Sequence, residues 1–137
     1  HILDFLVEKI DQGVIGLEPF EGVVTFHDPC RLGRMSGVYD APRRVLESIP
    51  GLKLKEMPRS RENGACCGTT AWMNCSKCSG LIRRERINEA RQTGATRLVT
   101  ACPKCQIHFR CAKSAYDFDM EITDIYDLVA DHMKIGS

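Results

Sequence analysis

Five cysteines in a defined spacing are the residues of this chain best suited to chemistry. They are Cys30, the doublet Cys66-Cys67, and the pair Cys102 and Cys105. Thirty-five residues separate Cys30 from Cys66, and thirty-four separate Cys67 from Cys102. Soft thiolate ligands favour iron–sulfur chemistry or zinc over calcium or magnesium, which prefer oxygen. Five thiolates also exceed the four ligands of a zinc tetrahedron or of a simple four-cysteine cluster, so the surplus requires an explanation.

The residues beside these cysteines favour a shared site. Pro103 follows Cys102 and can begin a helix without losing a backbone hydrogen bond. Cys102 and Cys105 would then lie on one helical face, where the helix N-terminus favours thiolates. Gly68 permits a turn that directs the adjacent doublet toward one large cofactor, which suits an iron–sulfur assembly better than a single zinc ion. The alternative for Cys102 and Cys105 is a lone Cys-x-x-Cys redox motif of the thioredoxin type.

Three other groups of side chains could take part in binding or catalysis. A second metal site, of zinc type, or a set of reactive thiols would use Cys75, Cys78, His108 and Cys111, with free buried thiols as the alternative. His27 and Asp28 precede Cys30 and suit a proton donor and its orienting partner, although a structural histidine at a strand end fits equally. The run 83–86 (Arg-Arg-Glu-Arg) is typical of a solvated helix face.

Basic side chains lie close in sequence to the cysteines. They are Arg31, Arg34, Arg59, Arg61, Lys104 and Arg110. Some are expected to offset the thiolate charge or to attract an anionic substrate, and the others to lie on the solvated surface.

Composition limits the class of protein. With 137 residues, 43% hydrophobic and 27% charged, residues 1–137 are expected to form a single globular domain. The net charge of +1 argues against a nucleic-acid partner, and the apolar runs are too short for a transmembrane segment. Eight cysteines would permit a secreted disulfide scaffold, but two Cys-x-x-Cys pairs and an apparent core favour metal or redox chemistry in the cytoplasm. A first residue of His instead of Met is typical of a processed chain or a fragment.

The elements that must position the cysteines alternate in type. Periodicity predicts helices over 2–13, 40–50, 77–93, 103–109 and 125–133, and strands over 22–26, 52–57, 97–101 and 120–122. Such alternation predicts an α/β, Rossmann-like fold with a mainly parallel four-stranded sheet and flanking helices. Each cysteine group follows one of the first three strands. Because ligands bind beyond the carboxyl ends of parallel strands, all three groups are expected at one sheet edge.

The pattern Cys-x35-Cys-Cys-Gly-x34-Cys-Pro-x-Cys resembles the CCG (cysteine-rich) domain of the heterodisulfide reductase catalytic subunits. The resemblance covers about residues 23–110 and includes residues 27–30 (His-Asp-Pro-Cys) and 98–103 (Leu-Val-Thr-Ala-Cys-Pro). Similar domains occur in iron–sulfur subunits of glycolate oxidase, anaerobic glycerol-3-phosphate dehydrogenase and some succinate dehydrogenases and fumarate reductases. The resemblance implies a non-cubane [4Fe–4S] cluster held by Cys30, Cys66, Cys67, Cys102 and Cys105. In heterodisulfide reductases such clusters cleave a disulfide in one-electron steps.

Two departures from the family accompany this resemblance. The catalytic subunits carry two such motifs, whereas this chain has one, and Cys75 and Cys78 stand where many relatives have a glycine-rich stretch. The resulting expectation is an electron-transfer domain of a heterodisulfide reductase-like oxidoreductase, cytoplasmic or within a larger or membrane-associated complex. Electrons would come from a flavin or ferredoxin-type iron–sulfur partner and pass to a disulfide or another small-molecule acceptor. The alternative is a zinc-binding structural or interaction module without catalysis.

Overall fold

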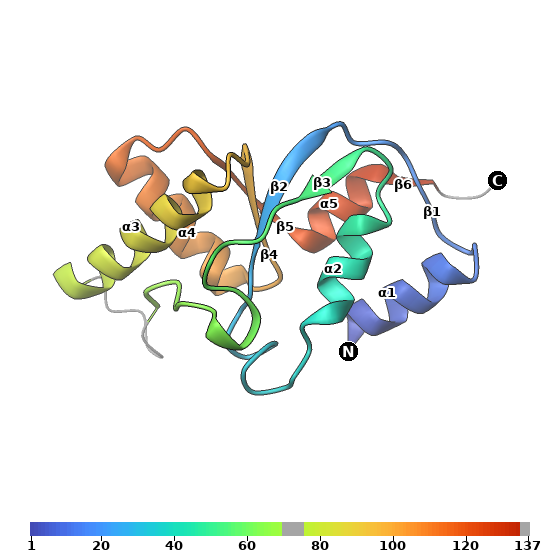
Figure 1. Cartoon of the computed structure of the whole chain (residues 1–137), viewed down its shortest axis with the longest axis horizontal. Coiled ribbons are helices and arrows are strands. Elements are labelled where there is room, and N and C mark those ends of the chain that lie inside the picture. The colour runs from blue at the N-terminus through green and yellow to red at the C-terminus, as the bar shows by residue number, and fades with distance from the viewer. Residues whose placement is uncertain (70–75, 135–137) are drawn as a thin grey trace.

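A parallel sheet between two layers of helices forms the framework of the chain (Figure 1). The structure is a computed structural model, which describes residues 1–69 and 76–134. The sheet has the strand order β3-β2-β4-β5, with β2 at Gly22–His27, β3 at Leu52–Leu54, β4 at Arg97–Thr100 and β5 at Glu121–Asp124. All three neighbouring pairs are parallel. The predicted α/β class with a four-stranded parallel sheet is therefore confirmed.

The helices divide between the two faces of the sheet. One layer consists of α1 (Ile2–Asp11), α2 (Asp40–Glu47) and α5 (Ile125–His132), and the other of α3 (Lys77–Gln92) and α4 (Pro103–Tyr116). Successive side chains of a strand point to opposite faces of the sheet, so Val99 packs in the core formed with α1, α2 and α5, and Leu98 packs in the core formed with α3 and α4. The same alternation directs His27, the last residue of β2, toward α3 and α4, where its ring meets Phe109. The edge of the sheet thus presents a buried polar side chain to these two helices.

Several boundaries differ from those that periodicity predicts. The strand expected over 52–57 ends at Leu54, after which Lys55 N–H donates to Val24 and the chain turns toward a 3-10 turn at Arg61–Asn63. The helix expected over 103–109 continues to Tyr116, because no Gly or Pro interrupts it before Asp117, whose φ of 51° ends it. A short antiparallel pair, β1 (Gly16–Leu17) with β6 (Met133–Lys134), is too brief to leave a periodic signal.

Within the described ranges, no helix is long and apolar enough to cross a membrane.

Candidate metal centre

Three chain segments bring the five predicted cysteines to one edge of the sheet. Residues 28–30 leave β2, residues 64–67 follow β3 after a loop, and residues 102–105 follow β4, and these three strands are neighbours. The segments surround two adjoining cavities, one of about 110 Å³ and one of about 300 Å³. Cysteines that line at least one of them are Cys30, Cys66, Cys67, Cys102 and Cys105. The expected convergence is therefore present in the structure.

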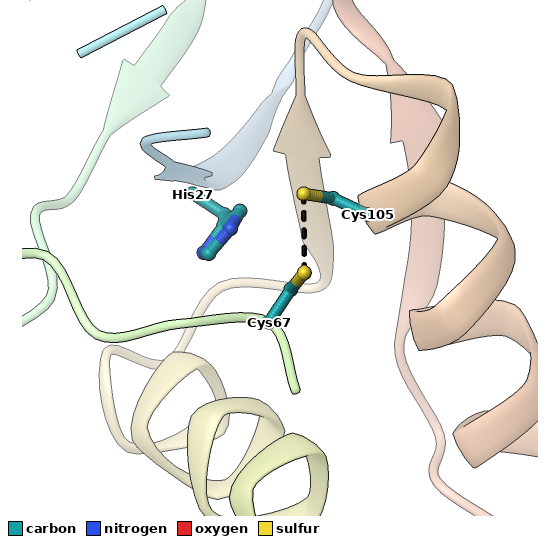
Figure 2. A group of neighbouring side chains, drawn as sticks. All are labelled: His27, Cys67 and Cys105. Atoms are coloured by element: carbon teal, nitrogen blue, oxygen red, sulfur yellow. Dashed lines mark hydrogen bonds between the residues drawn. The ribbon is translucent and has the colours of Figure 1, made fainter. Parts of the chain in front are cut away.

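Cys67 and Cys105 form the inner part of this site. Figure 2 shows their two sulfurs facing each other, and the sulfur–sulfur distance is 3.3 Å. The two residues are only 5% and 4% exposed. Cys30 and Cys66 are exposed and Cys102 is half-buried. All five are free thiols in the structure. The donor set thus has a buried inner side and a solvent-facing outer side.

The pKa values of the thiols differ because the thiols form hydrogen bonds with one another. Hydrogen bonds from Cys105 and Cys66 lower the pKa of Cys67. The pKa of Cys105 is raised by its hydrogen bonds to Cys102 and Cys67, and the pKa of Cys66 is raised by its hydrogen bond to Cys67. A hydrogen bond from Cys105, together with the backbone N–H groups at the start of α4, lowers the pKa of Cys102 to about 6 against the opposing effect of burial. Two thiolates are therefore favoured at neutral pH, and thiolates are the forms that bind metals.

Local backbone conformations explain how the cysteines reach these positions. Cys102 caps α4 and Pro103 occupies its first turn, as the sequence predicts. Gly68 has a φ of +82°, and a Cβ atom there would lie 2.5 Å from the carbonyl oxygen of Ser79. Its N–H donates to the Cys66 sulfur over 3.4 Å. Only glycine satisfies both the turn and the close approach to α3 that place the doublet beside the sheet edge.

Asp28 fixes the turn that carries Cys30. Its carboxylate accepts two hydrogen bonds from Arg43, at 2.6 and 2.9 Å, and one from the backbone N–H of Arg61 at 2.7 Å. Burial favours a raised pKa for Asp28, but these three bonds hold the pKa below its usual value. Arg43 also pairs with Glu56. Asp28 therefore acts as an ionised anchor that ties the sheet edge to α2 and to the loop before the doublet.

His27 lies beside the inner thiols. Its ring is 1% exposed, and its Nδ1 accepts a hydrogen bond from Arg86 Nε at 3.1 Å. The ligand atoms of His27, Cys67 and Cys105 all lie within 4.8 Å of one another, as Figure 2 shows for the three side chains. Burial lowers the pKa of His27, while its contact with Cys67 raises it. The imidazole is therefore favoured in its neutral form.

The burial of Arg86 corrects an expectation from the sequence. Residues 83–86 were expected to form a solvated face, but Arg83 is 4% exposed and Arg86 is fully buried. These two are three residues apart and share the inward face of α3. Arg86 pairs with Glu89 at 2.8 Å and donates to the carbonyl oxygen of Arg59 at 2.8 Å. The sequence of such a charged run does not indicate its burial, because two of the groups that Arg86 contacts, His27 and the Arg59 carbonyl oxygen, lie in distant segments.

The second predicted set does not assemble within the residues that the structure covers. Cys78 and Cys111 are exposed, whereas His108 is buried and its Nδ1 has no partner there. In this part of the chain, the group that could hold a metal ion is His27, Cys67 and Cys105. Cys75 lies outside the described residues, so the second site remains a prediction.

The six basic side chains divide between the site and the fold. Arg31 and Lys104 line the larger cavity, and Arg34 and Arg61 line the smaller one. Arg59 instead pairs with Glu85 and Glu89 on α3. Arg110 donates to the carbonyl oxygen of Ile122.

The residues present fit an iron–sulfur group. Thiols from three segments line a space that is partly enclosed and extends through two cavities, and a single tetrahedral ion would use only four of them. Hydrogen bonds of the kind that accompany cluster sulfurs are also in place: the Gly68 N–H donates to the Cys66 sulfur, and the Cys67 sulfur is hydrogen-bonded to the Thr69 hydroxyl at 3.1 Å.

Comparison with known proteins agrees with this geometry. The cysteine-rich domain family, CCG, matches residues 24–110. A dihydromethanophenazine:CoB–CoM heterodisulfide reductase subunit from Methanosarcina barkeri is 36% identical over 100% of this chain, and its counterpart from Methanosarcina mazei is 37% identical over 98%. One of the subunits of fumarate reductase (CoM/CoB) from Methanothermobacter marburgensis is 32% identical over 93% of the chain. The chain spans 34% of the two heterodisulfide reductase sequences and 26% of the fumarate reductase sequence.

Proposed function

The chain belongs to the CCG cysteine-rich domain family, and we propose that it is an iron–sulfur redox domain of a heterodisulfide reductase-like oxidoreductase. The observation that carries this proposal is the meeting of five cysteines from three segments around two cavities that share Cys30, Cys67 and Cys105. The similarity of the whole chain to part of the Methanosarcina heterodisulfide reductase sequences supports the same function. We further propose that residues 1–137 form one such domain.

The proposed cofactor is a [4Fe–4S] cluster of non-cubane type. Its ligands would be Cys30, Cys66, Cys67, Cys102 and Cys105. Five thiols around two adjoining cavities favour an asymmetric assembly over a symmetric cubane, which needs only four ligands. When bound, such a cluster supplies single electrons to a disulfide or a related acceptor.

The residues around the site divide the remaining tasks. The buried pair Cys67 and Cys105 would hold the inner side of the group, away from water. Cys30 and Cys66 are exposed, so an acceptor would approach on their side. Arg31 and Lys104 line the larger cavity and would attract and orient an acceptor that carries negative charge.

Residues 1–137 contain no Gly-x-Gly-x-x-Gly fingerprint for a dinucleotide, so we propose that electrons reach this domain from another redox domain or subunit. We propose a flavin protein or a ferredoxin-type iron–sulfur protein as the donor. A cytoplasmic location, alone or within a larger or membrane-associated complex, would keep the free thiols reduced.

Metal analysis of anaerobically prepared protein tests this proposal. We expect a brown chain with about four irons and four sulfides and a paramagnetic signal after one-electron oxidation or reduction. The variant Cys67→Ala should lose or reshape the cluster, whereas Cys111→Ala, a matched change at an exposed cysteine outside both cavities, should keep the iron and the spectrum. A colourless wild-type chain with about one zinc ion would instead support the structural module.

A further inference from the structure

The two ring nitrogens of His27 lie in different environments. Nδ1 is 3.1 Å from Nε of Arg86. A guanidinium N–H can only donate a hydrogen bond, so Nδ1 must accept it and cannot carry a proton. A neutral imidazole has one ring proton, which in His27 must therefore be on Nε2.

The surroundings of His27 keep the ring neutral and fixed. A doubly protonated ring would place a second cation against Arg86, in a region where both side chains are almost fully buried. Phe109 packs edge-on against the ring, with the two centroids 4.9 Å apart and an interplanar angle of 85°. Arg86 is itself fixed, because its Nη1 bonds to Glu89 and to the carbonyl oxygen of Arg59. The ring has little freedom to rotate and exchange its nitrogens.

Among the described residues, the sulfurs of Cys67 and Cys105 lie within 4.8 Å of a ring nitrogen of His27. Cys105 already donates to the Cys67 sulfur, so Cys67 is the acceptor available to the protonated nitrogen. We infer that Arg86 is a positioning residue that holds His27 as the Nε2–H tautomer, so that His27 donates a hydrogen bond to the Cys67 sulfur and is not a metal ligand. The part of this inference that concerns the cluster rests on the proposed function.

The alternative role for His27 would be that of a ligand through Nε2. That role requires Nε2 to lose its proton while Nδ1 still accepts from Arg86, which would make the ring an imidazolate anion. Ligating histidines instead donate from their second nitrogen to a carboxylate, carbonyl or water. In His27 the second nitrogen, Nδ1, instead accepts a hydrogen bond from the Arg86 guanidinium. The grouping of His27 with two thiols therefore does not describe a three-ligand metal site.

A donor to a ligand sulfur changes the redox balance of a cluster. The hydrogen bond stabilises the more negative, reduced state and so raises the reduction potential. At the midpoint potential of the wild type, loss of this hydrogen bond is expected to lower the ratio of reduced to oxidised protein about tenfold. For a one-electron couple this is a fall of about 59 mV in the reduction potential. Arg86 strengthens the effect, because its charge polarises the ring toward the sulfur.

The first test measures the nitrogen-15 chemical shifts of the histidine rings in the full chain, kept metal-free and reduced, at about pH 8.5. This pH is about two units above the usual histidine pKa. We expect the Nε2–H tautomer for His27. His132 is an internal control, because its Nδ1 lies 2.9 Å from the carbonyl oxygen of Leu128, which fixes the opposite, Nδ1–H tautomer. A proton on Nδ1 of His27 would overturn the inference.

Substitutions on α3 test the role of Arg86. Arg86→Lys retains a donor, so His27 should remain in the Nε2–H form. Arg86→Met removes the donor, and the Nδ1–H form should then appear. Arg84→Met is the matched control at an exposed position of the same helix and should change nothing. Retention of the pure Nε2–H form in Arg86→Met would refute the positioning role, and if that variant does not fold, the wild-type spectrum still decides the tautomer.

The second test follows a redox titration of the cluster-loaded chain by electron paramagnetic resonance. His27→Phe keeps a ring but has no donor, and it should show the tenfold change in the redox ratio. His27→Gln retains an N–H donor near the position of Nε2, and its ratio should stay within about threefold of the wild type. Equal midpoints in all three proteins would overturn the link to the cluster. A wild-type chain that takes up no iron would refute the proposed function, whereas the tautomer spectrum would still decide the Arg86–His27 assignment.

Discussion

Replacement of Arg43 by methionine should destabilise the chain far more than the same replacement of Arg44, its neighbour in α2. The Arg43 side chain is 4% exposed and donates to Asp28, also 4% exposed, and to Glu56. Arg44 pairs with Asp11 at the same 2.6 Å distance, but these side chains are 56% and 52% exposed. The two pairs therefore differ in burial while sharing their chemistry.

Burial decides the expected magnitudes. Loss of one partner from a buried ion pair leaves an uncompensated charge and typically costs about 3–5 kcal/mol. Loss of an exposed pair costs about 0–1 kcal/mol. In Arg43→Met the Asp28 carboxylate would keep, among the described residues, only the Arg61 N–H as a partner, so we expect a cost of about 3 kcal/mol or more in the free energy of unfolding. Guanidinium denaturation of the reduced, metal-free chain measures this difference.

The effect should depend on pH in a defined direction. The pKa of Asp28 is lowered in the folded protein, so the stabilisation is complete above the unfolded value of about 3.9 and is lost as pH falls through the folded pKa. The gap between wild type and Arg43→Met should thus be full at pH 7 and narrow below about pH 4. In the Asp28→Asn background, Arg43→Met should cost less than it does alone. A cost at pH 7 equal to that of Arg44→Met, or a gap unchanged by acid, would refute this reasoning.

Two further substitutions test the backbone turn and the buried pair on α3. Gly68→Ala should lower the free energy of unfolding by several times the ~1 kcal/mol expected for Gly37→Ala, and it should reduce iron binding. Both glycines have positive φ, but only at Gly68 would a Cβ lie 2.5 Å from the carbonyl oxygen of Ser79. Equal denaturation midpoints for the two variants would count against this reasoning. Glu89→Gln should cost about 2–4 kcal/mol at pH 7, more than Glu85→Gln at an exposed site of the same helix. Because its hydrogen bonds lower the pKa of Glu89 against the effect of burial, that cost should fade below about pH 4, and a cost that persists at pH 3 would contradict the assignment.

The sequence was sufficient for the parts of the site that depend on local order. Each cysteine group follows a strand whose composition is clear, and parallel strands place their carboxyl ends at one edge. The helix start at Pro103 and the need for glycine at Gly68 are also local properties, and both are present. These signals extend over a few residues, so they require no knowledge of distant contacts.

The polar support of the site could not be predicted in the same way. Arg43 reaches Asp28 across 15 residues, and Arg86 reaches His27 across 59. Each arginine stands in a helix that also carries an exposed arginine, Arg44 in α2 and Arg84 in α3, and a single sequence does not distinguish an inward arginine from an outward one. Only the fold shows that Arg86 is buried, because it donates to His27 and to the carbonyl oxygen of Arg59, which belong to other segments.

The unequal burial of the doublet explains why five thiols are not equivalent at this site. Both cysteines of the doublet line the smaller cavity before the turn at Gly68, but they differ in exposure. Cys67 faces inward to Cys105 and His27, whereas Cys66 remains exposed beside Cys30. The inner thiols are held by packing and hydrogen bonds on several sides, so they define where a bound group sits. The outer thiols Cys30 and Cys66 meet solvent, so in the proposed cluster we expect the surplus ligand to come from this side.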